Sequence, residues 1–174
     1  MSNNINYDLT KIKTFIFDVD GVLSPDSIPL GEDGIPVRMV NIKDGYALNL
    51  AGKLGYGLAI ITGGNSEAVK TRFENLGMNH IYLKSHIKTT DFEDYMAKTG
   101  YKPEEIVYVG DDIPDYEVMK RVGLSVAPAD ASAEIREIAT YVSHKKGGDG
   151  VARDIIERVM KAQGKWMTGP AFGW

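Results

Sequence analysis

The chain has 174 residues, a hydrophobic content of 43% and a formal net charge of −4. This length and apolar content predict one compact domain with a single core. Charges of both signs alternate along the chain without a long run of Lys or Arg, so nucleic acid is not an expected partner. The absence of cysteine excludes disulfides, thiolate metal ligands and a Cys nucleophile.

The N-terminal stretch MSNNINYDLTKIK is polar and lacks the apolar core of a signal peptide. No apolar segment approaches the roughly 20 residues that a membrane-spanning helix requires. We therefore expect a cytoplasmic protein with no membrane partner.

Five short apolar runs are predicted to be buried strands, because they are apolar on both faces and bounded by Gly, Asp or Pro. They lie at residues 14–17, 57–61, 81–83, 106–109 and 124–126. Amphipathic helices are predicted between and after them, at residues 44–54, 66–76, 90–98, 114–121, 131–139 and 151–162. This alternation predicts an α/β, Rossmann-like fold with a mostly parallel central sheet and helices on both faces.

Two segments depart from this alternation. Residues 24–41 are rich in Pro and Gly with short apolar pieces, which predicts a projecting two-stranded hairpin that turns at residues 31–34. Residues 164–174 have no periodicity and are predicted to form a C-terminal tail after a domain of residues 1–163. Because the tail ends in Pro, Phe and Trp, it is either a loose end or a segment that docks on a neighbouring subunit.

Polar residues suited to phosphoryl transfer follow four of these segments. Ligands of open parallel sheets bind beyond the C-terminal ends of the strands, where these residues are expected to meet. They are Asp18 and Asp20 after the first strand, Thr62, Gly63 and Gly64 after the second, Lys88 at the start of a helix, and Asp111, Asp112 and Asp115 after the fourth strand.

Asp18 is placed to attack phosphorus as a nucleophile, provided that cations screen the repulsion between the two anions. Mg²⁺ prefers oxygen ligands, which the carboxylates of Asp18 and Asp111 and the backbone carbonyl of Asp20 would supply. The Asp20 side chain can donate a proton to the leaving oxygen and later accept one from water.

The remaining residues of the set are predicted to hold the phosphate and to orient the metal ligands. Thr62 and the adjacent backbone N–H groups would hold phosphate oxygens, and Lys88 would neutralise charge in the transition state. Asp112 and Asp115 would orient the metal ligands. Each motif alone has an ordinary explanation, such as a helix cap for GDDxxD, but their joint occurrence in order favours catalysis.

The motifs FDVDGVLS, IITGG, a Lys and VGDDIPD resemble the four motifs of the haloacid dehalogenase superfamily, and the likeness covers nearly the whole chain. Within it, the predicted hairpin, VNIKDGYALNLA, KGGDGVARDIIE and AQGKW resemble the small phosphatases of 2-keto-3-deoxy sugar acid phosphates. This resemblance implies Mg²⁺, an aspartyl-phosphate intermediate and no separate cap domain. It also implies a homotetramer in which hairpins and tails contact neighbouring subunits.

The resemblance further implies a substrate, KDO 8-phosphate of lipopolysaccharide biosynthesis, with KDN 9-phosphate or another small sugar phosphate as the alternative. The implied substrate-binding residues are Asp20, Asn41, Ile42, Lys43, Asp44, Gly45, Gly63, Gly64, Arg72 and Lys88. Similar phosphatases often carry an arginine just after the Thr-Gly pair, where this chain has Gly64 and Asn65. A phospho-accepting signalling domain and a non-catalytic assembly domain are the rival functions.

Overall fold

A computed structural model describes residues 5–173 of the chain and contains one six-stranded sheet with helices on both faces. The strand order is β3-β2-β1-β4-β5-β6, and every pairing is parallel. The strands are β1 (Thr14–Phe17), β2 (Gly57–Ile61), β3 (His80–Tyr82), β4 (Ile106–Val109), β5 (Leu124–Ala127) and β6 (Tyr141–Val142). The predicted α/β fold is confirmed, with β6 as an additional short edge strand.

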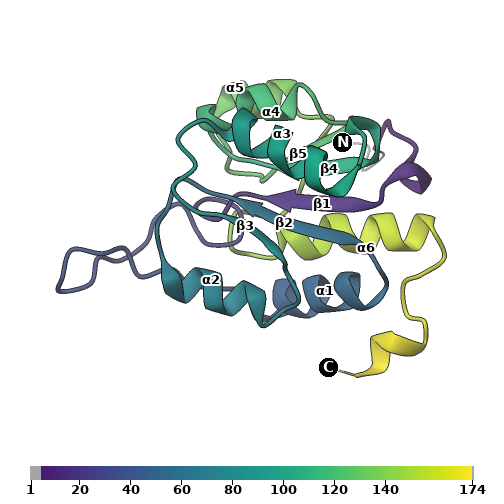
Figure 1. Ribbon diagram of the computed structural model, residues 1–174, viewed down its shortest axis with the longest axis horizontal. Helices are drawn as coiled ribbons and strands as arrows, with labels where there is room; N and C mark the ends of the chain where they lie inside the picture. The colour runs from purple at the N-terminus through teal and green to yellow at the C-terminus, as the bar shows by residue number, and fades with distance from the viewer. Residues whose placement is uncertain (1–4, 174) are drawn as a thin grey trace.

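Helices cover both faces of this sheet. Figure 1 shows α1, α2 and α6 on one face and α3, α4 and α5 on the other. The helices are α1 (Ile42–Lys53), α2 (Glu67–Glu74), α3 (Lys88–Thr99), α4 (Tyr116–Met119), α5 (Ala133–Ile138) and α6 (Val151–Ala162). No helix among residues 5–173 is long and apolar enough to cross a membrane.

The central strand β1 is apolar throughout because both of its faces are buried. Phe15 and Phe17 pack into the core beneath α1 and α6, whereas Ile16 packs into the core beneath α3 and α4. Side chains of a strand alternate between the faces, so a strand with two covered faces must be apolar at every position. This double burial explains why the strands were predicted from short apolar runs.

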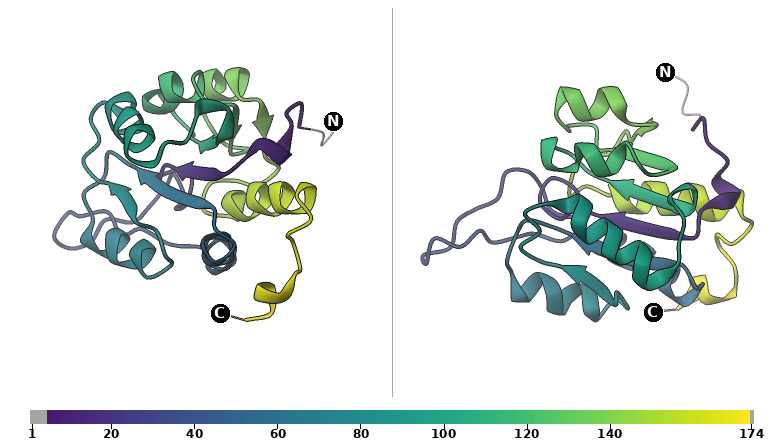
Figure 2. Two further views of the ribbon diagram at one scale, coloured as in Figure 1. Left: turned by 45° about the vertical axis from the view of Figure 1, so that its right-hand side comes forward. Right: turned by 45° about the horizontal axis from the view of Figure 1, so that its top comes forward.

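The segment of residues 24–41 projects from the domain as an extended loop, visible in all three views of Figures 1 and 2. Its two arms share one antiparallel bridge, Leu30 with Pro36, and turn at Gly34, whose φ is +77°. The turn lies where it was predicted, but the segment contains no regular strands. Its prolines lack a backbone N–H, and no strand among residues 5–173 extends it into a sheet, so a regular ladder does not form.

The C-terminal tail packs against its own chain. Tyr46 of α1 donates a hydrogen bond from its hydroxyl to the carbonyl of Ala171. The guanidinium of Arg153 lies 5.6 Å from the ring centroid of Tyr46 and 5.3 Å from that of Trp166. These contacts order residues that the sequence predicts either as a loose end or as an arm for a neighbour.

A buried carboxylate joins the two helices that pack on each other, α1 and α6. Asp44 accepts a hydrogen bond from the backbone N–H of Arg153 at 2.7 Å, in the first turn of α6. Burial raises the pKa of Asp44 to about 6, although that hydrogen bond and the charge of Arg153 oppose the shift. Folded protein therefore holds a proton on Asp44 at pH values where the unfolded chain has released it.

This difference predicts a pH-dependent contribution to stability. A raised pKa stabilises the fold fully below about pH 4, and the contribution is lost as pH rises through 6. We expect the free energy of unfolding of the wild type, relative to Asp44→Asn, to fall by about 2 to 3 kcal/mol between pH 4 and 7. Denaturant titrations of both proteins across this range measure the difference, and a constant difference would contradict the prediction.

Candidate active site

The adjacent strands β1 and β4 bring the predicted catalytic residues to one edge of the sheet. After β1 the chain adds β2 and β3 on one side, and then crosses to place β4 on the other side. Phe17 pairs with both Ile60 and Val109, so Asp18, Thr62 and Asp111 follow at nearly the same level. The site thus lies at the topological switch point, the expected position of a ligand site in such a sheet.

A buried ammonium group forms the centre of this site. Lys88, the first residue of α3, donates from Nζ to Asp18 Oδ2 at 2.6 Å and to Asp115 Oδ1 at 2.7 Å. Burial disfavours the charge of Lys88, but the carboxylates of Asp115 and Asp18 outweigh it and raise its pKa. Lys88 is therefore a fixed cation whose Nζ lies within hydrogen-bonding distance of the predicted nucleophile.

Asp115 is held by contacts on both of its carboxylate oxygens. Oδ1 also accepts from the hydroxyl of Tyr108 at 2.6 Å, and Oδ2 accepts from the backbone N–H of Asp111 at 3.1 Å and of Asp112 at 3.5 Å. A carboxylate with this many hydrogen bonds has a set orientation and few lone pairs left for a ligand. These contacts suit the predicted orienting role of Asp115.

Three carboxylates, here called the acidic cluster, converge beside Lys88. One oxygen from each of Asp18, Asp111 and Asp115 lies within 4.8 Å of the others. Burial, followed by the charges of Asp115 and Asp18, raises the pKa of Asp111 to about 8. Burial and the charge of Asp115 raise the pKa of Asp18 to about 6, against the opposing effect of Lys88. One ammonium does not neutralise this cluster, so its donors suit a divalent oxygen-seeking cation.

The loop after β1 passes so close to the acidic cluster that it requires a glycine. Gly21 has a φ of +78°, and a Cβ built on it would lie 2.0 Å from Asp111 Oδ2. Any side chain at this position would displace the carboxylate of Asp111. The glycine of the DVDG motif therefore has a steric reason that follows from the fold.

Thr62 follows β2, which lies on the other side of β1 from β4, and is buried. Its hydroxyl oxygen accepts a hydrogen bond from the backbone N–H of Gly64 at 3.2 Å. Its carbonyl accepts from the N–H of Ser85 at 2.9 Å, which ties the loop after β2 to the segment that leads into Lys88. Gly63 is exposed and Gly64 is half-buried in this loop.

Asp20 faces a partner that sequence analysis did not identify. Its carboxylate accepts from Arg38 through Nε to Oδ1 and through Nη2 to Oδ2, both at 2.8 Å. Arg38 belongs to the projecting segment of residues 24–41, in which it is the only arginine. Its being the single cation of this segment was the one signal in the sequence that could have drawn attention to it.

Comparison with known proteins agrees with this geometry. The sequence profile of the haloacid dehalogenase-like hydrolase family matches residues 58–155. A 3-deoxy-D-manno-octulosonate 8-phosphate phosphatase of Salmonella typhi is 39% identical over 95% of this chain and 88% of its own length. The chain belongs to the haloacid dehalogenase-like hydrolases.

Solved structures of this hydrolase family share the fold closely. The phosphatase of the same name from Yersinia pestis matches with a TM-score of 0.87 and 36% identity, over 90% of this chain and 85% of its own. That from Moraxella catarrhalis, solved in complex with magnesium ion, phosphate ion and KDO, matches with a TM-score of 0.87 and 31% identity, over 91% of each chain.

The segment predicted to contact substrate in this hydrolase lies at the start of α1. Asn41 caps the helix, because its Oδ1 accepts from the N–H groups of Lys43 at 2.9 Å and Asp44 at 3.2 Å. Asp44 is buried against α6, and Gly45 packs on Arg72, whose Nη2 would lie 2.8 Å from a Cβ at Gly45. Their described contacts are structural, and substrate contact by these residues stays a prediction.

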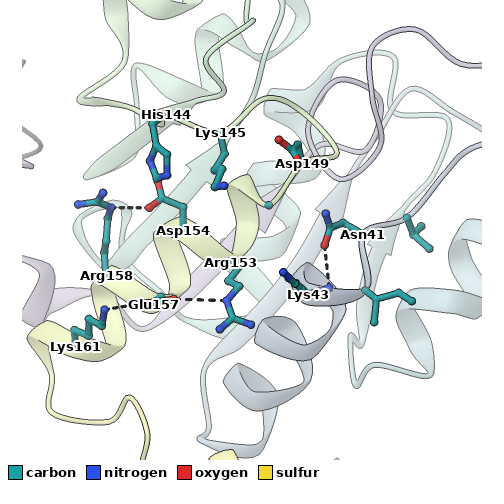
Figure 3. A pocket seen from close by; sticks show the side chains of 13 residues that line it. Asn41, Lys43, His144, Lys145, Asp149, Arg153, Asp154, Glu157, Arg158 and Lys161 are labelled. Atoms are coloured by element: carbon teal, nitrogen blue, oxygen red, sulfur yellow. Dashed lines mark hydrogen bonds and ion pairs between the residues drawn. The ribbon is translucent and has the colours of Figure 1, made fainter.

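A hollow of about 960 Å³ opens between the start of α1 and α6 (Figure 3). Asn41, Ile42 and Lys43 line one side of it, and the cations of α6 line the other. Each of these three cations is paired on its own helix: Arg158 with Asp154, and both Arg153 and Lys161 with Glu157. No residue of the acidic cluster lines this hollow, so the hollow is separate from the site around Lys88.

The acidic cluster predicts stabilisation by a divalent cation. We expect Mg²⁺ at about 100 times its Kd to raise the Tm of the wild type by roughly 5–10 °C, because the ion binds only the folded cluster. Asp111→Asn should lose most of this shift, whereas Glu117→Gln, which changes an exposed carboxylate outside the acidic cluster, should keep it. Thermal unfolding with and without Mg²⁺ measures the effect, and an undiminished shift in Asp111→Asn would exclude Asp111 as a ligand.

Proposed function

We propose that this hydrolase is a Mg²⁺-dependent phosphatase that converts KDO 8-phosphate to KDO and phosphate through an aspartyl-phosphate intermediate. The observation that carries the proposal is the buried Lys88 ammonium, which contacts Asp18 at 2.6 Å beside the carboxylate of Asp111. The identity to the phosphatase of Salmonella typhi over most of both chains supports the substrate. The magnesium, phosphate and KDO bound by the relative from Moraxella catarrhalis support the metal and the product.

Asp18 is the proposed nucleophile. Its Oδ1 accepts from the backbone N–H of Val19 and its Oδ2 from Lys88, so the carboxylate is held in one orientation. An oxygen of Asp18 attacks phosphorus and the bond from phosphorus to the sugar oxygen breaks, with Asp20 donating a proton to that oxygen. Water then attacks the phosphorus and gives a proton to Asp20. This second step releases phosphate and regenerates the Asp18 carboxylate.

The residues around the nucleophile are proposed to balance charge. Asp18, Asp111 and the backbone carbonyl of Asp20 would hold Mg²⁺, which when bound neutralises part of the charge of the carboxylates and the phosphate. Thr62 and Lys88 would bind phosphate oxygens. Asp115 would orient Lys88, and Asp115 with Asp112 would support the loop that carries Asp111.

The nucleophile and the substrate can be tested together. Asp18→Asn should reduce phosphate release from KDO 8-phosphate by at least about 10⁴-fold, since the covalent intermediate cannot form. EDTA should abolish the activity of the wild type, and added Mg²⁺ should restore it.

Parallel measurements with KDN 9-phosphate should give a clearly lower kcat/KM than with KDO 8-phosphate. Full turnover by Asp18→Asn would refute the nucleophile, and a higher kcat/KM for KDN 9-phosphate would change the substrate.

We also propose that the protein is a cytoplasmic homotetramer in which the projecting segments meet. The segment exposes large apolar side chains, with Leu30 71% and Ile35 55% accessible, and exposed apolar clusters of this kind mark contact surfaces. The tail packs on α1 of its own chain, and we propose that its exposed Phe172 contacts a neighbouring subunit.

Changing the apolar surface of the segment should therefore reduce the oligomeric state. Leu30→Ser combined with Ile35→Ser is expected to lower the molar mass measured by light scattering from that of a tetramer toward that of a monomer. Val142→Ser, an exposed apolar position on β6, should leave the mass unchanged. A tetramer that persists in the double variant would argue against assembly through this segment.

A further inference from the structure

Arg38 differs from its neighbours on the projecting segment in the direction of its side chain. Val37 is 52% exposed and Met39 is similarly exposed, whereas the side chain of Arg38 is only 10% exposed. The segment therefore turns its apolar side chains to solvent and its single guanidinium toward the catalytic edge of the sheet.

The ion pair that Arg38 makes is open on one side. Its fork binds both oxygens of Asp20, but the side chain of Asp20 remains 40% exposed. Arg38 also donates weakly from Nη1 to the carbonyl of Pro36 at 3.5 Å. The pair is open to solvent on the Asp20 side, so an incoming anion can reach the guanidinium from that side and compete with the carboxylate for it.

The guanidinium occupies the space that a side chain at residue 64 would fill. A Cβ built on Gly64 would lie 2.9 Å from Arg38 Nη2 and 3.5 Å from Thr62 Oγ1. The φ of Gly64 is not in the left-handed region, so space rather than backbone conformation explains the glycine. Gly64 therefore leaves room for Arg38 beside the Thr62 hydroxyl.

We propose that Arg38 is a further substrate-binding residue, which binds oxygens of the substrate phosphate from the side of the leaving group. This inference rests on the proposed phosphatase function. In the free enzyme the carboxylate of Asp20 accepts from both Nε and Nη2 of Arg38. In the complex, a phosphate oxygen replaces Asp20 as the acceptor of one of these two N–H donors. The planar fork of arginine matches the spacing of two phosphate oxygens.

The position of Arg38 favours the phosphate over a more distant group of the substrate. Nη2 lies on the same side of Gly64 as the hydroxyl of Thr62, and its other neighbour is Asp20, two residues beyond the nucleophile. Together with Lys88 on the nucleophile side, Arg38 would place a second cation at the reacting phosphorus, where charge-assisted hydrogen bonds act most strongly.

The proposal is tested by phosphate affinity as well as by turnover. Arg38→Gln should raise the competitive inhibition constant of inorganic phosphate roughly tenfold or more, because a charge-assisted contact is lost. It should lower kcat/KM by similar factors for KDO 8-phosphate and for p-nitrophenyl phosphate, which carries no carboxylate. Arg38→Lys, which keeps a point charge, should give values of both constants between those of the wild type and those of Arg38→Gln.

Two further variants separate this role from a structural one. Gly64→Ala keeps the arginine but crowds its Nη2, so it should also raise the inhibition constant of inorganic phosphate. This result is informative even if Arg38→Gln folds poorly. Arg121→Gln removes an exposed arginine that pairs with Glu93, and it should leave the phosphate constant unchanged. An unchanged constant in both Arg38→Gln and Gly64→Ala, or a loss confined to KDO 8-phosphate, would overturn the proposal.

Failure of the proposed function gives a different pattern. If the wild type cleaves p-nitrophenyl phosphate but not KDO 8-phosphate, the sugar acid is wrong and the Arg38 comparison is made with p-nitrophenyl phosphate. If the wild type cleaves neither, titration calorimetry with inorganic phosphate and Mg²⁺ compares the wild type with Arg38→Gln directly. Equal affinities, or no binding by the wild type, would then refute the role of Arg38.

Discussion

The ammonium of Lys88 between Asp18 and Asp115 is the interaction on which the site depends. All three groups are buried, and an uncompensated charge in such a place is costly. The pair of contacts therefore fixes the start of α3 against the ends of β1 and β4. The same contacts hold the carboxylate of Asp18 in one orientation, so the interaction that positions α3 also prepares the proposed nucleophile.

The sheet supplies the remaining constraint, because the switch from β3 to β4 places two acidic loops side by side. The backbone of Gly21 lies against the carboxylate of Asp111, which leaves no room for a side chain at residue 21. Burial, and after it the charges of Asp115 and Asp18, raise the pKa of Asp111 to about 8, so ionisation of all three carboxylates is disfavoured without a cation. Folding thus concentrates negative charge that a divalent ion offsets, and metal binding and stability are linked through the same residues.

The projecting segment has two sides with different chemistry. Its outward side chains, such as Leu30 and Ile35, are apolar and suit contact with another subunit. Its inward side chain, Arg38, reaches Asp20 and the loop at Gly64. A segment that serves both purposes would couple assembly to the shape of the site, since contacts on the outer side hold the backbone that carries the guanidinium.

The sequence by itself determined the α/β fold and the positions of Asp18, Thr62, Lys88 and Asp111. Strands with two buried faces are apolar at every position, and catalytic residues of a parallel sheet follow those strands directly. Only the tertiary structure decided the partner of Asp20, the burial of Asp44, the two-residue strand β6 and the docking of the tail. These features depend on contacts between distant parts of the chain, made through irregular or very short segments that carry no periodic pattern.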